Sequence, residues 1–438
     1  MLSIKPASSY SISRIPVIMN YRTLTKLGSL ALLLYLLLTA TNARAYGVLT
    51  HQAIIDAAWK DSIEPLLRKR FPKATDEDLK KAHAHAYGGS IVQDMGYFPF
   101  GNTFFTDLTH YVRSGAFVEN LIKSATTVEE YGFALGALSH YNADIHGHPL
   151  GTNKAVALVY PKVKAEHGQE VTYAEDPVSH IKTEFGFDVL QVARGNYAPE
   201  KYQSFIGFKV SKELLERAFL ETYGLELNDV FMNVPLAIGT YRYTIRGFMP
   251  DLTKAAWQAK RSDIQEASPG ITRSKFHYHM RRAEFNQTWG TDYERPNLVA
   301  RFAAWVIKVL PKAGPFRTLA FKPPTPEAEK LFYHSFNTTV ENYTKLIRQL
   351  RQQGQLKLDN MQLDTGEPTK PGNYKLADET YAELLDKLAK SDFKNTSPAL
   401  RRDILQFYQP RKAMQEVAED DRSELKESLK KLQAFHLL

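Results

Sequence analysis

Hydrophobic residues recur at helical spacing along most of the chain. Between residues 52 and 71, for example, Ile55, Trp59 and Ile63 belong to a set of apolar side chains that would line one face of a helix. The same periodicity predicts helices over residues 76–86, 127–145, 177–193, 212–223, 228–248, 297–309, 326–351, 379–390 and 412–435. Alternating, strand-like patterns are scarce, and the composition of 43% hydrophobic and 24% charged residues is that of a globular chain. The sequence therefore predicts an all-α fold.

The first 45 residues differ from the rest of the chain. They hold five basic residues, no acidic residue and an apolar run over residues 30–40, which is too short to span a bilayer because a spanning helix takes about 20 residues. Ala43-Arg44-Ala45 follows as a small-x-small pattern. These features predict a signal peptide over residues 1–45, cut after Ala45, and export to the periplasm or the exterior. A retained short anchor is the alternative, and a start at Met19 would give a leader of more usual length.

Glycine and proline mark the divisions of the mature chain. They cluster near residues 310–325 and 358–377, between predicted helices. We therefore expect one helical domain over residues 46–310 and a helical C-terminal extension over residues 311–438. Thr126 and Glu129 fit a capping box ahead of the helix over 127–145. Thr325-Pro326-Glu327 has the hydroxyl, proline and acid of a helix start at residue 326.

Most of the net positive charge lies in the predicted leader. The whole chain has 56 basic and 48 acidic residues, a formal charge of +8, and removal of the five basic leader residues lowers this to +3. The basic balance therefore gives no support for a nucleic-acid binder. The chain has no cysteine, which excludes disulfides, thiolate metal sites and cysteine nucleophiles.

Histidine is concentrated in one part of the sequence. Of thirteen histidines, nine lie between residues 51 and 180: His51, His83, His85, His110, His140, His146, His148, His167 and His180. In a chain without cysteine, a metal ion would be held by imidazole, carboxylate or backbone atoms. This concentration therefore predicts a metal site built from histidine and acidic residues.

The spacing of these residues sharpens the prediction. His140, Asp144 and His148 follow one another at intervals of four, so on a helix they share one face. His180 and Glu184 repeat the interval on a second helix. A single pair of this kind is often only a solvated surface pair, but two facing motifs predict a site that holds more than one ion, and zinc accepts both ligand types.

From residue 46 to about residue 190 the chain resembles the zinc-dependent phospholipase C family, including the amino-terminal domain of glycosylphosphatidylinositol-specific phospholipase D. More distantly it is similar to the single-strand-specific zinc nucleases of fungi and plants. Five ordered segments carry the resemblance: Tyr46-Gly-Val-Leu-Thr-His51, Ala86-Tyr87-Gly-Gly-Ser-Ile-Val-Gln-Asp94, Asp107-Leu-Thr-His110, Ser139-His140-Tyr-Asn-Ala-Asp144-Ile-His146-Gly-His148 and His180-Ile-Lys-Thr-Glu184. The resemblance implies a multi-helix bundle around a cluster of two to three zinc ions.

The resemblance also implies a ligand set. The amino group and carbonyl of Tyr46, where the family usually has tryptophan, would hold one zinc together with His51, provided that the leader is cut after Ala45. The remaining ligands fall into a second and a third set: Asp94, His110 and His140, with Asp144 bridging to the first zinc, and then His148, His180 and Glu184. His146 is the alternative to His148. Asp94 would either bind zinc or act as general base.

The implied activity is hydrolysis of phosphodiesters. Zinc lowers the pKa of bound water toward about 7, so a zinc-bound hydroxide would attack phosphorus in a phospholipid or a related phosphoester. Peripheral contact with a membrane would accompany a lipid substrate. A zinc-dependent single-strand nuclease or nucleotidase is one alternative, and only this reading implies a nucleic-acid partner. A non-catalytic zinc-stabilised binding protein is the other.

Several neighbouring residues are left with two interpretations. The aromatic segment over residues 96–105 lines a substrate pocket or packs as a buried loop. Asp107 and Asp188 are candidates to orient His110 and His180. His83 and His85 are two residues apart, a spacing that does not share a helical face, so we expect them outside the ligand set.

Overall fold

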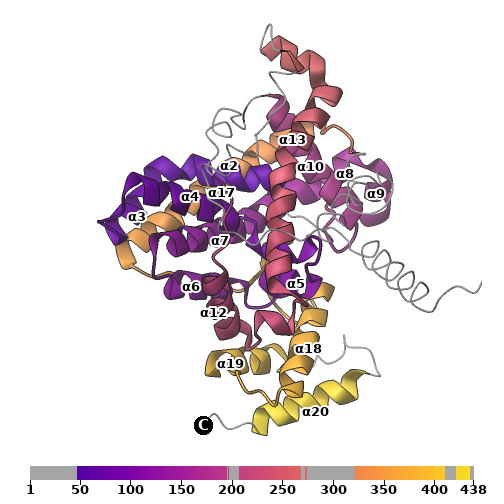
Figure 1. Cartoon of the computed structure of the whole chain (residues 1–438). Coiled ribbons are helices and arrows are strands. Elements are labelled where there is room, and N and C mark those ends of the chain that lie inside the picture. Colours follow the sequence, from indigo (N-terminus) through magenta and orange to yellow (C-terminus); the bar gives the residue numbers. More distant parts are fainter. Residues whose placement is uncertain are drawn as a thin grey trace, which may run out of the picture. The chain divides into compact units, whose positions relative to one another are not determined.

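The computed structural model describes residues 47–194, 196, 207–267, 272–273, 321–409 and 421–434 (Figure 1). All of them lie in one contact-defined unit, residues 40–438. The predicted leader, Tyr46, the predicted helix over 297–309 and the predicted domain boundary near residue 310 lie outside the described residues, so these remain predictions.

Helices make up nearly all of the regular secondary structure of the described residues, which confirms the all-α prediction. The first part of the chain forms α2 (Val48–Ala58), the π-helix η1 (Trp59–Ile63), α3 (Glu64–Arg70), α4 (Asp76–Gly89), the 3₁₀ helix η2 (Val92–Tyr97), α5 (Thr103–Tyr111), α6 (Ser114–Ser124), α7 (Val128–Gly147), the π-helix η3 (His148–Thr152), α8 (Asn153–Val159), α9 (Pro161–His167) and α10 (Pro177–Ala193). The later part forms α12 (Lys212–Tyr223), the 3₁₀ helix η4 (Leu227–Asp229), α13 (Val234–Ala267), α17 (Pro326–Gln353), α18 (Lys375–Lys390), α19 (Pro398–Phe407) and α20 (Asp421–Ala434).

The described residues contain one small sheet. Strands β1 (Met361–Gln362) and β2 (Glu367–Pro368) pair antiparallel, with Met361 opposite Pro368 and Gln362 opposite Glu367. We call residues 361–368 the C-terminal hairpin. Its strands are too short to show an alternating pattern, so periodicity did not predict the hairpin.

Most predicted helices are present, with local corrections. The helices α10 and α12 have the predicted bounds, whereas the helix predicted over 52–71 is interrupted by the π-helix η1. The predicted capping box at Thr126 and Glu129 is wrong by one residue. Thr127 is the N-cap of α7 and accepts a hydrogen bond from Glu130 N at 3.2 Å, because only from this position does the hydroxyl reach a free amide of the first turn. The start of α17 at residue 326 is confirmed, since Thr325 accepts a hydrogen bond from Ala328 N.

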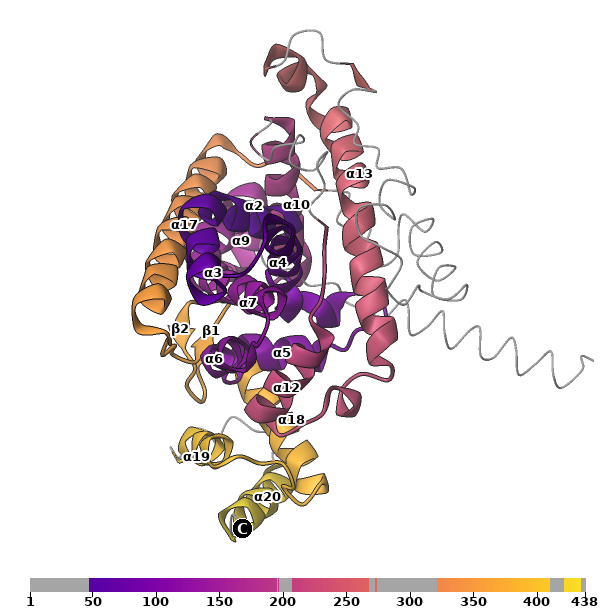
Figure 2. The ribbon, with the colours of Figure 1, turned by 60° about the vertical axis from the view of Figure 1, so that its left-hand side comes forward.

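Helix α7 lies at the centre of the packing that positions the site. A Cβ at Gly132 would lie 2.4 Å from Ala82 O and one at Gly136 would lie 2.1 Å from Ala86 O, so α4 rests directly on the backbone of α7. Helix α17 also packs against α7, and against α2 and α8, while α13 packs against α10 (Figure 2). Phe133, Leu135 and Leu138 of α7 are fully buried. Such close packing fixes the helix that carries His140 and Asp144. No helix among the described residues has the length and apolar character that crossing a membrane requires.

Candidate metal centre

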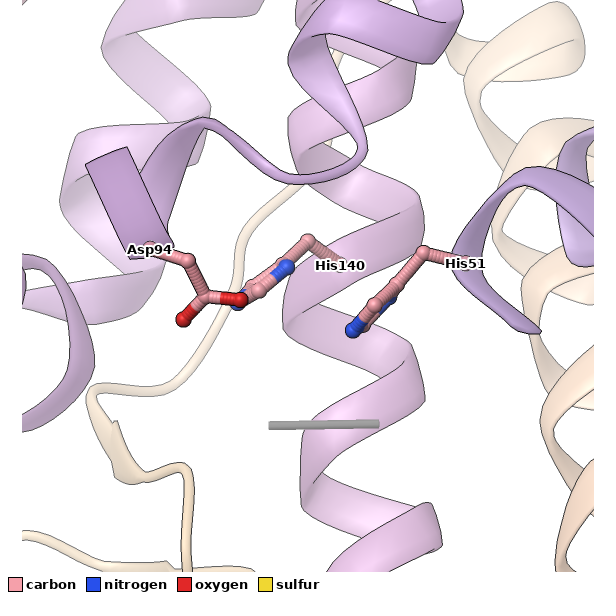
Figure 3. A group of neighbouring side chains, drawn as sticks. All are labelled: His51, Asp94 and His140. Atoms are coloured by element: carbon pink, nitrogen blue, oxygen red, sulfur yellow. The ribbon is translucent and has the colours of Figure 1, made fainter. Parts of the chain in front are cut away.

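Three groups of buried histidine and acidic side chains meet around α7. They are His51, Asp94 and His140; His110, His140 and Asp144; and His148, His180 and Glu184, with the ligand atoms of each group within 4.8 Å of one another. These eight side chains are at most 2% exposed. Figure 3 shows His51 from α2, Asp94 from η2 and His140 from α7 turned toward one another. The structure thus brings together every predicted ligand position among the described residues.

Asp144 is the centre of the larger half of this arrangement, which we call the Asp144 cluster (His51, Asp94, His110, His140 and Asp144). Its Oδ2 lies 3.1 Å from His140 Nε2 and 3.4 Å from His110 Nε2, and its Oδ1 lies 3.6 Å from His51 Nε2. Burial alone would raise the pKa of Asp144, but the nearby imidazoles of His140 and His110 outweigh burial and hold the pKa well below its usual value.

The histidines of the Asp144 cluster are oriented by main-chain oxygens. His110 Nδ1 donates to Thr106 O at 2.9 Å, and His140 Nδ1 donates to Ser90 O at 3.0 Å. Because a carbonyl only accepts, Nδ1 carries the hydrogen, and each neutral ring presents the lone pair of Nε2 inward. The two Nε2 atoms lie 3.3 Å apart, close to the oxygens of Asp94 and Asp144. Such a set of converging acceptors suits a cation.

The carboxylates of this cluster favour positive charge on the neighbouring histidine rings. Burial opposes protonation of His110, yet the carboxylates of Asp144 and Asp94 raise its pKa well above the usual value. The same two carboxylates raise the pKa of His140 against its burial. Neither oxygen of Asp144 accepts a hydrogen bond of good geometry from the described residues. A metal ion would meet the same demand with better geometry.

The smaller half, which we call the Glu184 group, consists of His148, His180 and Glu184. His180 Nδ1 lies 3.0 Å from Glu184 Oε1, and among the described residues neither His180 Nδ1 nor either carboxylate oxygen of Glu184 has a hydrogen-bond partner. Burial, followed by the charges of Asp144 and Asp94, raises the pKa of Glu184 well above its usual value. Burial and the neighbouring His148 lower the pKa of His180. These orphaned, fully buried acceptors also fit a metal ion.

Asp188 anchors the start of α2, the helix that carries His51. Its carboxylate accepts hydrogen bonds from Leu49 N at 3.0 Å, Thr50 N at 3.1 Å and Thr50 Oγ1 at 2.8 Å. A Cβ at Gly47 would lie 2.1 Å from this carboxyl group, so the chain can pass only without a side chain there. Asp188 therefore serves as an N-cap supplied from α10, a role that sequence spacing did not suggest.

Asp107 is close to the site without a described hydrogen bond to His110, which is held by Thr106 O. Burial raises the pKa of Asp107 to about 7, because a charge would be poorly solvated there. The expectation that Asp107 orients His110 is therefore wrong. His110 is oriented instead by the main-chain oxygen of Thr106, and a main-chain partner cannot be predicted from side-chain identity.

The structure places the residues of the remaining alternatives as follows. His148 joins the Glu184 group, whereas His146 is half-buried and belongs to none of the three groups. His83 stacks on Trp59 with ring centroids 3.7 Å apart, and its Nε2 lies 3.0 Å from Asp56 Oδ1. As expected, His83 and His85 are not part of the groups. In the aromatic segment, Phe98, Phe104 and Phe105 are buried in the main core, which supports the buried-loop interpretation.

Comparison with known proteins adds an independent observation. Residues 50–233 match the sequence profile of the family described as zinc-dependent phospholipase C. The match covers less than half of the chain and shows that this region is similar to that family. The resemblance seen in the sequence is thereby confirmed. No curated protein and no solved structure matches the chain significantly. The eight side chains of the candidate centre all fall within the matched phospholipase C region, whereas α17 to α20 and the C-terminal hairpin lie beyond it.

Proposed function

We propose that this protein is a zinc-dependent phosphodiesterase of phospholipase C type, acting on phospholipids or related phosphoesters. The observation that carries the proposal is the meeting of eight buried histidine and acidic side chains within the region that matches the phospholipase C family. Buried acceptors without hydrogen-bond partners, such as those of Asp144 and Glu184, are unfavourable unless a cation compensates them.

We infer that the centre holds two to three zinc ions. His51 together with the amino group and carbonyl of Tyr46 would hold one ion, and Asp144 would be shared between this ion and a second one bound by Asp94, His110 and His140. The Glu184 group would hold the third. Zinc bound there would supply a nucleophile at neutral pH and would neutralise charge on the phosphoryl group.

The chain's own residues position the reaction. Asp94 Oδ1 is buried beside His110 Nε2 at 3.4 Å and accepts no described hydrogen bond. Asp94 would therefore either bind metal or take a proton from the attacking water as general base. The carbonyls of Thr106 and Ser90 hold His110 and His140 in one orientation, so no ring has to turn when the substrate arrives.

We also propose that the protein is exported, to the periplasm or beyond, after cleavage behind Ala45. The acid-free basic leader, its short apolar run and the tripeptide Ala43-Arg44-Ala45 support this. Cleavage would free the amino group of Tyr46, so zinc loading would depend on processing and on pH. A phospholipid substrate would also require peripheral contact with a membrane.

The proposal is tested with the mature protein, residues 46–438, loaded with zinc. We expect release of diacylglycerol and a phosphorylated head group from phosphatidylcholine, and loss of this activity on treatment with a chelator. Full activity in metal-free protein would contradict the proposal. Nucleotides released from single-stranded DNA without lipid turnover would identify a nuclease. Tight zinc binding without hydrolysis, with Asp94→Asn behaving like the parent, would identify a non-catalytic zinc protein.

A further inference from the structure

The C-terminal hairpin touches the helices that carry the candidate ligands, although it lies outside the phospholipase C match. Leu363 N donates a hydrogen bond to His110 O at 3.1 Å, on α5. At the turn, Gly366 has a φ of +68° and lies against α7, where a Cβ would be 2.4 Å from Ile145 O, one residue beyond Asp144. The carbonyl of Asp364 accepts a hydrogen bond from Asn153 Nδ2 at 2.8 Å. The hairpin thus contacts the backbone of α5 and α7, which carry candidate ligands. Through Asn153 it is also connected to α10, which carries His180.

Asn153 connects the hairpin to the Glu184 group. Its side-chain oxygen Oδ1 lies 2.9 Å from His180 Nε2. The direction of the amide is determined by its other contact: a carbonyl cannot donate, so Nδ2 must face Asp364 O, and Oδ1 must then face His180. His180 Nε2 therefore carries the hydrogen and donates it to Asn153.

This hydrogen bond decides which nitrogen of His180 can bind a metal. With the hydrogen on Nε2, the lone pair lies on Nδ1, the atom that is 3.0 Å from Glu184 Oε1 and has no hydrogen-bond partner among the described residues. Histidines that bind metals usually donate their other ring N–H to an oxygen acceptor, which fixes both tautomer and ring orientation. Asn153 is placed to do this for His180.

The local fold brings Asn153 to this position. Its backbone N–H donates to His148 O across the π-helix η3, an i to i+5 bond. Because the π turn is wider, Asn153 lies one turn beyond His148, which is a member of the Glu184 group. In an α-helix, residue 152 would take this place. Asn153 is 3% exposed, so its hydrogen bonds are shielded from water.

The Asp364 carbonyl is itself held firmly. The carboxylate of Asp364 accepts hydrogen bonds from Tyr111 OH at 2.9 Å and from Tyr374 OH, and Thr369 Oγ1 donates to Tyr111 O at 3.0 Å. Asp364 is 3% exposed. A fixed carbonyl holds the Asn153 amide in one orientation, and a fixed amide selects one tautomer of His180.

We propose that Asn153 and the C-terminal hairpin are positioning elements of the metal centre: the Asp364 carbonyl orients Asn153, and Asn153 turns His180 Nδ1 toward Glu184. This inference rests on the proposed role of the Glu184 group as a metal site. It gives the region beyond the family match a function, because the ligand residues alone do not fix the orientation of His180.

The test measures zinc affinity in the mature full-length protein by competition with a chelator, without any substrate. We expect Asn153→Ala to weaken one zinc site by about 10- to 100-fold and to leave the others unchanged. Asn153→Asp keeps an oxygen acceptor for His180 and should recover most of the affinity. Asn142→Ala is the matched control, since Asn142 is a buried asparagine that donates to a C-terminal carbonyl, Thr339 O at 2.8 Å, and is not among the grouped residues. Its zinc affinities should equal those of the parent.

A double-mutant cycle separates positioning from general loss of stability. Asp364→Ala should weaken the same site by less than Asn153→Ala does, and Asn153→Ala/Asp364→Ala should bind zinc no worse than Asn153→Ala alone, because both changes act through one contact. Unchanged zinc affinity in Asn153→Ala, or equal and additive losses in Asn153→Ala and Asn142→Ala, would overturn the inference and leave the proposed hydrolase intact. Zinc affinities that follow the expected order in a protein that hydrolyses no phosphodiester would overturn the proposed function and support the inference.

Discussion

The two halves of the candidate metal centre are equally buried but differ in their protonation. In the Asp144 cluster, Asp144 has a lowered pKa and His110 and His140 have raised ones, so the metal-free state holds ion pairs. In the Glu184 group, Glu184 has a raised pKa and His180 a lowered one, so the metal-free state favours neutral side chains. Since burial is nearly complete in both halves, the difference comes from the neighbouring charges.

The two halves also differ in how their histidines are held. His110 and His140 donate to main-chain oxygens of Thr106 and Ser90, inside the matched region. His180 donates to a side chain, Asn153, which is held in turn by the C-terminal hairpin. The side chains of the Asp144 cluster and the oxygens that orient His110 and His140 therefore lie within the matched region, whereas His180 of the Glu184 group is linked through Asn153 to a later part of the chain.

Asp144→Asn should have the largest effect, because this side chain lies within 4 Å of four histidine rings, those of His51, His110, His140 and His148. We expect kcat/KM to fall by about 10³-fold or more, and the zinc content to fall in the Asp144 cluster. Elemental analysis and a phosphatidylcholine assay measure both. Asp386→Asn, on the exposed face of α18, is the control and should match the parent. Retention of full zinc content and activity by Asp144→Asn would remove the basis of the comparison.

Glu184→Gln should act on one half only. We expect the loss of one zinc equivalent and a fall in kcat of about 10²-fold, because the Asp144 cluster keeps its own ligands. Elemental analysis of Glu184→Gln and Asp144→Asn side by side shows how much zinc each variant loses. If Glu184→Gln and Asp144→Asn empty the same sites, the two halves are one indivisible centre and the comparison is wrong.

In the metal-free protein, the shifted pKa values of Glu184 and Asp144 should change the folding stability in opposite directions. The raised folded pKa of Glu184 means that the unfolded carboxyl ionises first, so stability falls as pH rises above about 4.3, at up to about 1.4 kcal/mol per pH unit. Glu184→Gln removes this loss and should be more stable than the parent at neutral pH. The lowered folded pKa of Asp144 stabilises the fold above about 3.9, so Asp144→Asn should be less stable there.

Urea unfolding in the presence of chelator, at several pH values between 4 and 7, measures these differences. Glu184→Gln should become more stable relative to the parent as pH rises, whereas Asp144→Asn should stay less stable than the parent by a nearly constant amount. A displacement of both variants in the same direction would show that burial, and not the neighbouring charges, decides the protonation of both halves.

The smallest effect is expected at the cap of α2. Asp188→Ala removes three hydrogen bonds from the first turn and should lower the free energy of unfolding by about 1–2 kcal/mol. Zinc affinity of the Asp144 cluster should fall as well, because His51 lies on that turn. Thr75→Ala removes the capping box of α4 and is the matched control, with a similar loss of about 1 kcal/mol. Its zinc affinity should not change, and a parallel loss in both variants would count against a specific role for Asp188.

The helices, and the grouping of the histidine and acidic side chains, could be predicted from the sequence because both depend on local spacing. His140, Asp144 and His148 lie one helical turn apart, and their order along the chain resembles that of a known family. Partners that are main-chain oxygens, such as Ser90 O and Thr106 O, carry no side-chain signal. Asp188 and Asn153 act across 138 and 211 residues, on Thr50 and Asp364. Such pairs are determined by packing and cannot be read from periodicity.

The central claim is that zinc binds at both halves of this centre. Diffraction from crystals of the mature protein, measured at the zinc absorption edge, tests it most directly. We expect anomalous peaks between Asp144 and the surrounding imidazoles, and a separate peak beside His180 Nδ1 and Glu184. Zinc-replete crystals without a peak at these residues, or with zinc bound only elsewhere, would contradict the account.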